Sequence, residues 1–373
     1  MFSKIFSNKA VDEDKKEMIN RHLDCYRSDA FPKGILFPEK KIELTVDKDK
    51  TIAISFTLPF PCNGELEQLS ADLSLLLKQK VRFSIQYDVF SVREHALKGI
   101  KNIIAIASGK GGVGKSTTAV NLAYALMAEG AKVGVLDADI YGPSIPTLLG
   151  LQGQKPSSVD GKLITPFDAH GLSAMSIGFM VDDNDATVWR GPMASRAFSQ
   201  LLNETAWHEL DYLIVDMPPG TGDIQLTLAQ QVPVAAAVII TTPQDIALKD
   251  AIKGIAMFNK VKLPVLGIIE NMSYHQCSNC GHQSHVFGKG GGENIAQKYD
   301  TQLLGQLPLD IEIREDADSG NSIVIKNSTS DITLQYRNIA RKIAAQLFLQ
   351  YQDRISTSDD IIFKVKLTPE EEH

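Results

Sequence analysis

A glycine-rich segment follows an apolar, β-branched run directly and precedes a stretch of helical character. Its sequence, GKGGVGKSTT, fits the pattern G-x-x-x-x-G-K-[ST] from Gly109 to Ser116. Glycines let backbone N–H groups wrap around phosphate oxygens, and the helix N-terminus adds partial positive charge. We therefore predict a nucleotide phosphate site, with Lys115 at the β- and γ-phosphates and Ser116 on Mg²⁺. The predicted contacts of the loop are Gly109, Lys110, Gly111, Gly112, Val113, Gly114, Lys115, Ser116 and Thr117.

Carboxylates follow two further apolar runs. Asp137 and Asp139 come after Val133–Leu136, and Asp216 comes after Tyr212–Val215. Residues i and i+2 of an extended chain point the same way, and ligands of open α/β sheets bind at the carboxyl ends of strands. Asp216 has the position of a Walker B acid, which holds Mg²⁺. Turn or capping roles are the alternative for each aspartate, and the nearby phosphate loop favours the nucleotide site.

The loop carries a second lysine, Lys110, which an ordinary phosphate loop does not need. The pattern K-G-G-x-G-K-[ST] resembles the deviant Walker A family, which includes septum-site and plasmid-partition ATPases, the arsenite pump ATPase and nitrogenase iron protein. In that family this lysine reaches the nucleotide of a dimer partner. The resemblance therefore implies a homodimeric ATPase in which Lys110 and Lys115 are catalytic, whereas the alternative for Lys110 is a solvated surface lysine.

The same resemblance assigns further residues. It implies that Asp139 orients the attacking water and that Asp137 belongs to the Mg²⁺ shell. It matches Asn271 to an asparagine that contacts adenine, and Pro308 and Asp310 to the loop that closes over the base.

The segment ENMSYHQCSNCGH, residues 270–282, contains a Cys-x-x-Cys pair, Cys277 and Cys280. Such a pair can bind metal, act as a redox dithiol or be incidental. Its spacing to His282 and His285 is too tight for a zinc finger, and a thioredoxin-type pair is expected at a helix start in another fold. Two copies of the pair around a dimer axis supply four thiolates, which suit a [4Fe–4S] cluster or zinc. We expect a shared iron–sulfur cluster.

Several longer motifs resemble the Mrp/ApbC iron–sulfur cluster carrier proteins. They are DADIYGPSIP, VWRGPMAS, DMPPGTGDIQLTL, TTPQDIAL and ENMSYHQCSNCGH, and the match extends over residues 100–350. The resemblance implies slow Mg²⁺-dependent ATP hydrolysis and a labile [4Fe–4S] cluster held between two protomers. It also implies partners: a cluster assembly scaffold and recipient apo iron–sulfur proteins. More weakly, the N-terminal part is similar to the small α/β domain of the MIP18 type. Cys62 lies where such domains can carry a cysteine that relays a cluster, although a plain turn cysteine is the simpler interpretation, as it is for Cys25.

Short apolar runs that alternate with helical stretches must position these residues. They are Ile103–Ala107, Val133–Leu136, Tyr212–Val215, Val234–Ile240, Val265–Ile269 and Leu303–Leu307. Continuous apolar strands between helices predict an α/β fold, a P-loop NTPase whose mostly parallel sheet has helices on both faces.

The first part of the chain has another pattern. A hairpin at Lys41–Leu58, a helix at Leu66–Leu77 and a strand at Val81–Val89 predict a β-β-α-β unit, joined to the rest by a linker at residues 94–101. We predict a small α/β domain at 1–95, the ATPase domain at 96–350 and a loosely held tail at 351–373, with a strand-like piece, IIFKVKL.

Composition limits the alternatives. The net charge of −7 disfavours a generally basic, nucleic-acid-binding surface, and four cysteines in 373 residues make no disulfide scaffold. The longest apolar run, residues 232–240, is half of the roughly 20 residues that a membrane span needs. With no apolar signal-like segment at the N-terminus, we expect a cytoplasmic protein that binds neither nucleic acid nor membrane.

Two other classes of protein remain open. A partition or positioning ATPase uses the same lysines and aspartate, but the tail is neither strongly basic nor helical in its period, and the cysteine pair has no function there. A nitrogenase-like reductase spreads its cluster ligands far apart in the sequence.

Overall fold

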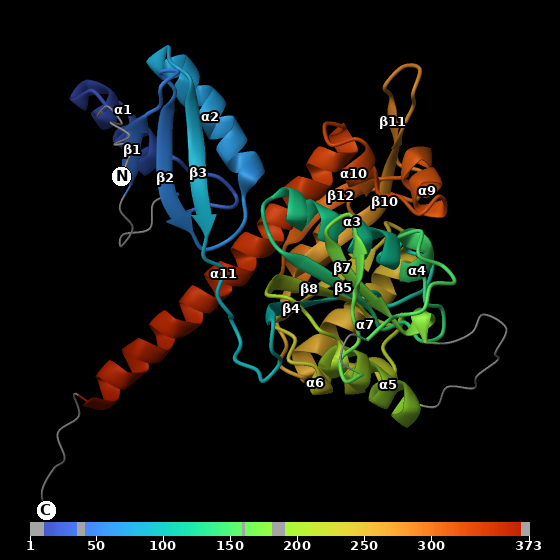
Figure 1. Cartoon of the computed structure of the whole chain (residues 1–373). Coiled ribbons are helices and arrows are strands. Elements are labelled where there is room, and N and C mark those ends of the chain that lie inside the picture. The colour runs from blue at the N-terminus through green and yellow to red at the C-terminus, as the bar shows by residue number, and fades with distance from the viewer. Residues whose placement is uncertain (1–10, 36–41, 159–160, 181–190, 367–373) are drawn as a thin grey trace, which may run out of the picture.

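The computed structural model describes residues 11–35, 42–158, 161–180 and 191–366, and side chains within them except at 191–192 and 353–366. Two α/β units lie side by side, and the long helix α11 (Asp331–Lys366) runs beneath the first and along the second (Figure 1). Among the described residues, no helix combines the length and apolar character that crossing a bilayer requires.

The N-terminal unit has a three-stranded sheet of order β1-β2-β3. Strands β1 (Glu43–Val46) and β2 (Ile52–Leu58) form an antiparallel hairpin, and β3 (Val81–Tyr87) pairs parallel to β2 after helix α2 (Asn63–Leu77). This arrangement agrees with the expected β-β-α-β order. A further helix, α1 (Glu13–Cys25), precedes it.

The second unit is built on a nine-stranded sheet of order β11-β10-β9-β4-β8-β5-β7-β6, with β12 also paired to β10. Pairing is parallel except for β6 and β11. The strands are β4 (Ile100–Ala107), β5 (Val133–Asp137), β6 (Phe167–Ala169), β7 (Leu172–Ser176), β8 (Leu210–Asp216), β9 (Ala236–Thr241), β10 (Val265–Gln276), β11 (Gln283–Ser284) and β12 (Leu303–Pro308). The helices are α3 (Lys115–Ala128), α4 (Ile145–Leu148), η1 (Ile177–Phe179), α5 (Gly191–Glu204), α6 (Asp223–Gln231), α7 (Asp245–Lys260), α8 (Gly291–Lys298), α9 (Ile311–Asp318) and α10 (Ile323–Lys326).

The sheet is buried on both faces, as its uninterrupted apolar runs predict. Along the central strand β4, Ile104 and Ile106 pack into one hydrophobic cluster with α3 and α11. Ile103, Ala105 and Ala107 point the other way, into a cluster with α5, α6 and α7. Alternation of side chains along a strand thus supplies both cores from a single segment.

All six predicted apolar strands are present, and the tail differs from expectation. The prediction of a strand at IIFKVKL was wrong for residues 361–366, because α11 continues through these residues to Lys366. The view of the tail as non-helical was wrong for the same reason. Residues 331–366 contain neither proline nor glycine, so an established helix extends at low cost, whereas a new strand would need a partner. α11 also crosses residue 351 without interruption.

The two units share one hydrophobic cluster. It contains Phe60 of the N-terminal unit and Phe348 of α11, whose ring centroids lie 5.7 Å apart. Phe90, in the segment that joins the units, packs on Phe348 at 5.6 Å, so that segment is also anchored.

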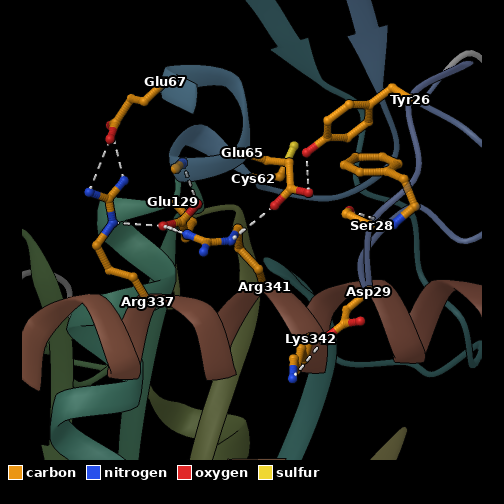
Figure 2. Close-up of polar contacts among 12 residues, drawn as sticks. Tyr26, Ser28, Asp29, Cys62, Glu65, Glu67, Glu129, Arg337, Arg341 and Lys342 are labelled. Atoms are coloured by element: carbon orange, nitrogen blue, oxygen red, sulfur yellow. Dashed lines mark hydrogen bonds and ion pairs between the residues drawn. The ribbon is translucent and has the colours of Figure 1, made fainter. Parts of the chain in front are cut away.

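An ion-pair network lies beside this apolar contact (Figure 2). Glu129, fully buried at the C-terminal end of α3, accepts from Arg337 Nε at 2.7 Å and from Arg341 Nη1 at 2.9 Å. Its second oxygen accepts from the backbone N–H of Gly64, at the start of α2, at 2.8 Å. The helix that begins at the phosphate loop therefore ends on the N-terminal unit.

Candidate functional site

The phosphate loop connects the central strand β4 to α3. Gly114, the residue before the helix, has φ +78°, and a Cβ there would lie 2.3 Å from Asn271 Nδ2. Only glycine combines that conformation with that close approach. Lys110 is exposed on the outer part of the loop.

The Lys115 side chain is only 6% exposed and lies among carboxylates from two neighbouring strands. Its Nζ donates to Asp216 Oδ1 at 2.5 Å and lies 4.0 Å from Asp139 Oδ2. Ser116 Oγ lies 3.3 Å from the same Nζ. The ends of β5 and β8 thus bring together the charged residues that the sequence placed at separate strand ends.

Asp137 is fully buried and supports the loop after β5. Its Oδ1 accepts from the backbone N–H of Asp139 at 3.0 Å, and its Oδ2 accepts from Ile145 N–H at 3.1 Å and Ser176 Oγ at 3.0 Å. Burial and the nearby Asp216 carboxylate raise the pKa of Asp137. Burial also raises the pKa of Asp139, and the Lys115 charge acts in the opposite direction.

Two buried carboxylate oxygens at this edge have no hydrogen-bond partner among the described residues. They are Asp139 Oδ1 and Asp216 Oδ2. Carboxylate and hydroxyl oxygens are the ligands that Mg²⁺ prefers, and leaving them unpaired in a buried site is costly. The free oxygen of Asp216 and the hydroxyl of Ser116 therefore fit a magnesium ion.

The three residues matched to the adenine pocket lie on adjacent elements. Asn271 is buried, and its Nδ2 donates to the carbonyl of Val113 in the phosphate loop at 2.9 Å. Pro308 ends β12 opposite Tyr274 of β10, and Asp310 caps α9 by accepting from the Glu312 N–H at 2.8 Å.

The cysteine pair lies in the turn of a hairpin that the sequence did not predict. β10 continues beyond the sheet and pairs with β11, with His275 opposite Ser284, and this hairpin projects from the body of the unit (Figure 1). Cys277 N–H donates to the His282 carbonyl at 3.0 Å, and Gly281 N–H donates to the Cys277 carbonyl at 2.8 Å. Cys280 is exposed and Cys277 is partly exposed.

The turn also alters the chemistry of its thiols. The backbone N–H groups of Cys280 and then Asn279 point at the Cys277 sulfur and lower its pKa. The thiolate is the form that binds metal. In the part of the chain that the structure describes, no group of three or more His, Cys, Asp and Glu side chains is arranged for a metal ion. The turn therefore offers two thiol ligands.

The other cysteines occupy different settings. Cys62 is fully buried just before α2, and burial raises the pKa of its thiol. In this conformation Cys62 cannot contact another protein. Cys25 is exposed at the end of α1.

Sequence reasoning missed Glu270, a fully buried carboxylate next to Asn271. It accepts hydrogen bonds from Ser273, Gln306 and the backbone of Gly292. Its position directly after the apolar run Val265–Ile269 was the available signal.

Comparison with known proteins identifies the family of this chain. The model of the NUBPL iron-transfer P-loop NTPases matches residues 99–344. The iron-sulfur cluster carrier protein of Haemophilus influenzae is 53% identical over 364 residues, which cover 95% of this chain and 97% of its own. That of Salmonella typhimurium is 56% identical over 311 residues, 81% of this chain and 84% of its own. The iron-sulfur cluster transfer protein NUBPL of Mus musculus is 48% identical over 257 residues, 68% of this chain and 80% of its own.

Solved structures share the fold of the second unit. A nucleotide-binding protein from Archaeoglobus fulgidus in complex with ADP aligns with TM-score 0.55 and 38% identity, over 62% of this chain and 90% of that chain. The cell division ATPase MinD of Pyrococcus furiosus aligns with TM-score 0.50 and 21% identity, over 65% and 98%, which supports the fold alone. The chain therefore belongs to the NUBPL iron-transfer P-loop NTPases, and with them to the Mrp/ApbC family that its motifs indicated.

Proposed function

We propose that this protein carries an iron–sulfur cluster and transfers it to apo iron–sulfur proteins, with ATP binding and hydrolysis at the phosphate loop. The observation that carries the proposal is the course of β10. One strand places Asn271 on the phosphate loop and a thiol pair at the tip of a projecting hairpin. The names of the similar carrier and transfer proteins support the same role.

ATP binds at the loop from Gly109 to Thr117 in this proposal, with Asn271, Pro308 and Asp310 around the base. Ser116, Asp137 and Asp216 would hold Mg²⁺, which supplies positive charge beside the phosphates. The partnerless Asp216 Oδ2 supports this assignment.

Hydrolysis then depends on residues that orient the attacking water and on residues that stabilise the charge of the transferring phosphoryl group. Asp139 accepts a hydrogen bond from the attacking water and directs it in line with the bond that breaks, as its partnerless Oδ1 allows. Lys115 neutralises charge on the transferring phosphoryl group within the protomer. Lys110, exposed on the loop, does so from the partner protomer of a homodimer.

The cluster is the cargo. Cys277 and Cys280 supply two thiolates, half of the Cys₄ set of a [4Fe–4S] cluster, and a second protomer supplies the others. Exposure at a hairpin tip leaves the cluster accessible to an assembly scaffold and to recipient proteins. Zinc fits the same four ligands and is the alternative cargo.

We also propose a small MIP18-like domain at residues 1–95, the ATPase domain at 96–350, and action in the cytoplasm without nucleic acid or membrane partners. The C-terminal segment at 351–373 is then a tail that continues α11 as far as Lys366.

Anaerobic reconstitution with iron and sulfide tests the cluster assignment. We expect about two irons per protomer in the wild-type dimer, because four irons are shared by two chains. Cys277→Ser and Cys280→Ser should abolish loading, while Cys25→Ser and Cys62→Ser should not. Full iron loading of the Cys277/Cys280 double variant would refute this site, and zinc without iron in protein isolated anaerobically would favour the alternative cargo.

A further inference from the structure

β10 changes direction where it leaves the sheet. Its pairing with β12 shifts register between Glu270 and Tyr274, and Met272 within this bulge has φ +55°, which is unusual for a side-chain-bearing residue. Asn271 bonds to the phosphate loop, and beyond the bulge the strand forms the first arm of the cysteine hairpin. The orientation of the cysteine turn is therefore set at this bulge.

Glu270 holds three elements together at the root of the hairpin. Its carboxylate is fully buried and accepts from Ser273 Oγ at 2.6 Å, Gln306 Nε2 of β12 at 2.8 Å and Gly292 N–H of α8 at 2.6 Å. All three partners are donors, which matches the acceptor-only character of an ionised carboxylate. Hydrogen bonds to a charged group are about twice as strong as neutral ones.

The approach of α8 depends on a glycine. A Cβ on Gly292 would lie 3.0 Å from Glu270 Oε2 and 3.1 Å from Leu303 Cδ1, both tighter than ordinary contact. The helix start thus reaches the carboxylate only because residue 292 has no side chain.

Through Ser273, the hydrogen bonds of Glu270 are linked to both arms of the hairpin. The carbonyl of Ser273, on the outgoing arm, bonds to Nδ1 of His285, just after β11 on the returning arm, at 3.0 Å. The next residue, Tyr274, accepts from the Leu309 N–H at 2.7 Å. Fixing Ser273 therefore fixes the base from which Cys277 and Cys280 project.

We propose that Glu270 is a positioning residue for the thiol pair: through Ser273, Gln306 and the N-terminus of α8 it sets the orientation in which the hairpin presents Cys277 and Cys280. This inference rests on the proposed cluster-binding function. Glu270 does not contact the cargo. Groups that are hydrogen-bonded directly to metal ligands typically change metal affinity by roughly 10–100-fold when they are removed, and this range sets the scale for Glu270, which acts through the base of the hairpin.

The test compares Glu270→Ala and Glu270→Gln with Asp211→Asn. Asp211 is also a largely buried carboxylate, bonded to Lys101 and to the backbone of Lys132, but it lies at the amino end of β8, far from the hairpin. Each reconstituted protein is mixed with an iron chelator and the rate of iron release is followed. Tm and ATP affinity are measured on the same samples.

We expect Glu270→Ala to release iron roughly 10–100-fold faster while its ATP affinity changes little. Glu270→Gln should lie between it and the wild type, since an amide oxygen still accepts from Gly292 and the amide nitrogen can donate to Ser273. Asp211→Asn should lower Tm without altering release. Release that follows Tm across all three variants would overturn the positioning role, as would wild-type release from Glu270→Ala.

A second pair of variants leaves the carboxylate in place. Gly292→Ala pushes α8 away from Glu270, whereas Gly254→Ala adds the same methyl in α7, where its nearest neighbour, Ile239 Cδ1, lies at an ordinary 3.7 Å. We expect faster release from Gly292→Ala alone. Equal release from the two alanine variants would contradict the proposal even if Glu270→Ala fails to fold.

Co²⁺ bound to the thiols gives a readout that needs no cluster. Its thiolate charge-transfer absorption should shift in Glu270→Ala and Gly292→Ala and stay unchanged in Asp211→Asn. A wild-type protein that takes up Co²⁺ but no cluster would refute only the proposed cargo, and the Co²⁺ spectra would then decide the role of Glu270. A wild type that takes up neither would refute both.

Discussion

Lys115 is a nearly buried cation between two carboxylates, Asp216 at 2.5 Å and Asp139 at 4.0 Å. In surroundings of low polarity such charges attract strongly, so each fixes the position of the others. The three side chains come from one loop and two strand ends. The residues proposed for catalysis are thus preorganised by the sheet.

Lys115→Ala should abolish ATP turnover and weaken nucleotide binding, because it removes the buried positive charge of the loop. Asp139→Ala should leave the ATP Kd nearly unchanged and lower kcat by about 10²-fold, the scale of loss when a reacting group is no longer held in line. Equilibrium binding and steady-state phosphate release measure the two effects. Lys132→Ala, which removes an exposed ion pair with Glu209, is the control. An Asp139→Ala variant with wild-type turnover would exclude Asp139 from water positioning.

The cysteines should differ in reactivity. The lowered pKa of Cys277 increases its thiolate fraction at neutral pH, whereas the raised pKa of buried Cys62 decreases it. In the cluster-free native protein, iodoacetamide should therefore modify Cys277 well before Cys62, and the profile for Cys277 should begin at lower pH than for an ordinary thiol. Peptide mass mapping over time and pH measures this order, with denatured protein as the reference. Early labelling of Cys62 would show that its burial is not maintained.

At the scale of elements, β10 connects the phosphate loop to the cysteine hairpin. It pairs with β9 in the sheet, contacts the phosphate loop through Asn271 and continues into the cysteine hairpin. A change in the loop can therefore reach the hairpin through a single strand.

This continuity predicts reciprocal coupling between ATP and cluster. ATP affinity should differ between cluster-free and cluster-loaded dimers by roughly 5–150-fold, and cluster affinity should change by the same factor. Calorimetry on both forms measures the difference. Asn271→Ala should reduce this difference in ATP affinity, because it removes the hydrogen bond to the Val113 carbonyl. Lys110→Ala should also reduce the difference if the coupling passes through the contact between Lys110 and the nucleotide of the partner protomer. Equal affinities in the wild-type protein would show that the two sites act independently.

The sequence predicted the buried strands of the large sheet from their continuous apolar runs, since burial on both faces leaves a strong signal, and the strands of the small sheet from alternation. It did not predict β6 and β7, which are short. β11 has two polar residues and exists only because the Cys277–Gly281 turn folds it back onto β10. Glu270 was missed for a related reason. A carboxylate after a strand resembles a solvated residue until three donors from separate elements are seen to converge on it.

At the scale of the whole molecule, the two units are joined by packing and by charge. Arg337 and Arg341 project from α11 toward Glu129 (Figure 2), and both guanidinium groups are themselves mostly buried. A buried ion pair contributes little net stability, but removal of one partner leaves charges that water cannot reach.

Glu129→Ala should therefore destabilise the protein by about 3–5 kcal/mol, because two buried guanidinium groups and the Gly64 N–H lose their acceptor. Glu67→Ala removes the 64%-exposed partner of Arg337 and should cost no more than about 1 kcal/mol. Urea unfolding of both variants provides the comparison. Similar costs would mean that water reaches the Glu129 network.

The interface also determines how this chain can be divided for study. A fragment that begins at residue 96 would leave Phe348, which is 7% exposed in the whole chain, without its packing against Phe60, and would expose the buried Glu129 carboxylate to solvent. Apolar surface uncovered in this way promotes self-association. Measurements on such a fragment would therefore mix its catalytic properties with the aggregation caused by the newly exposed surface. Turnover and cargo release should be measured on the whole chain.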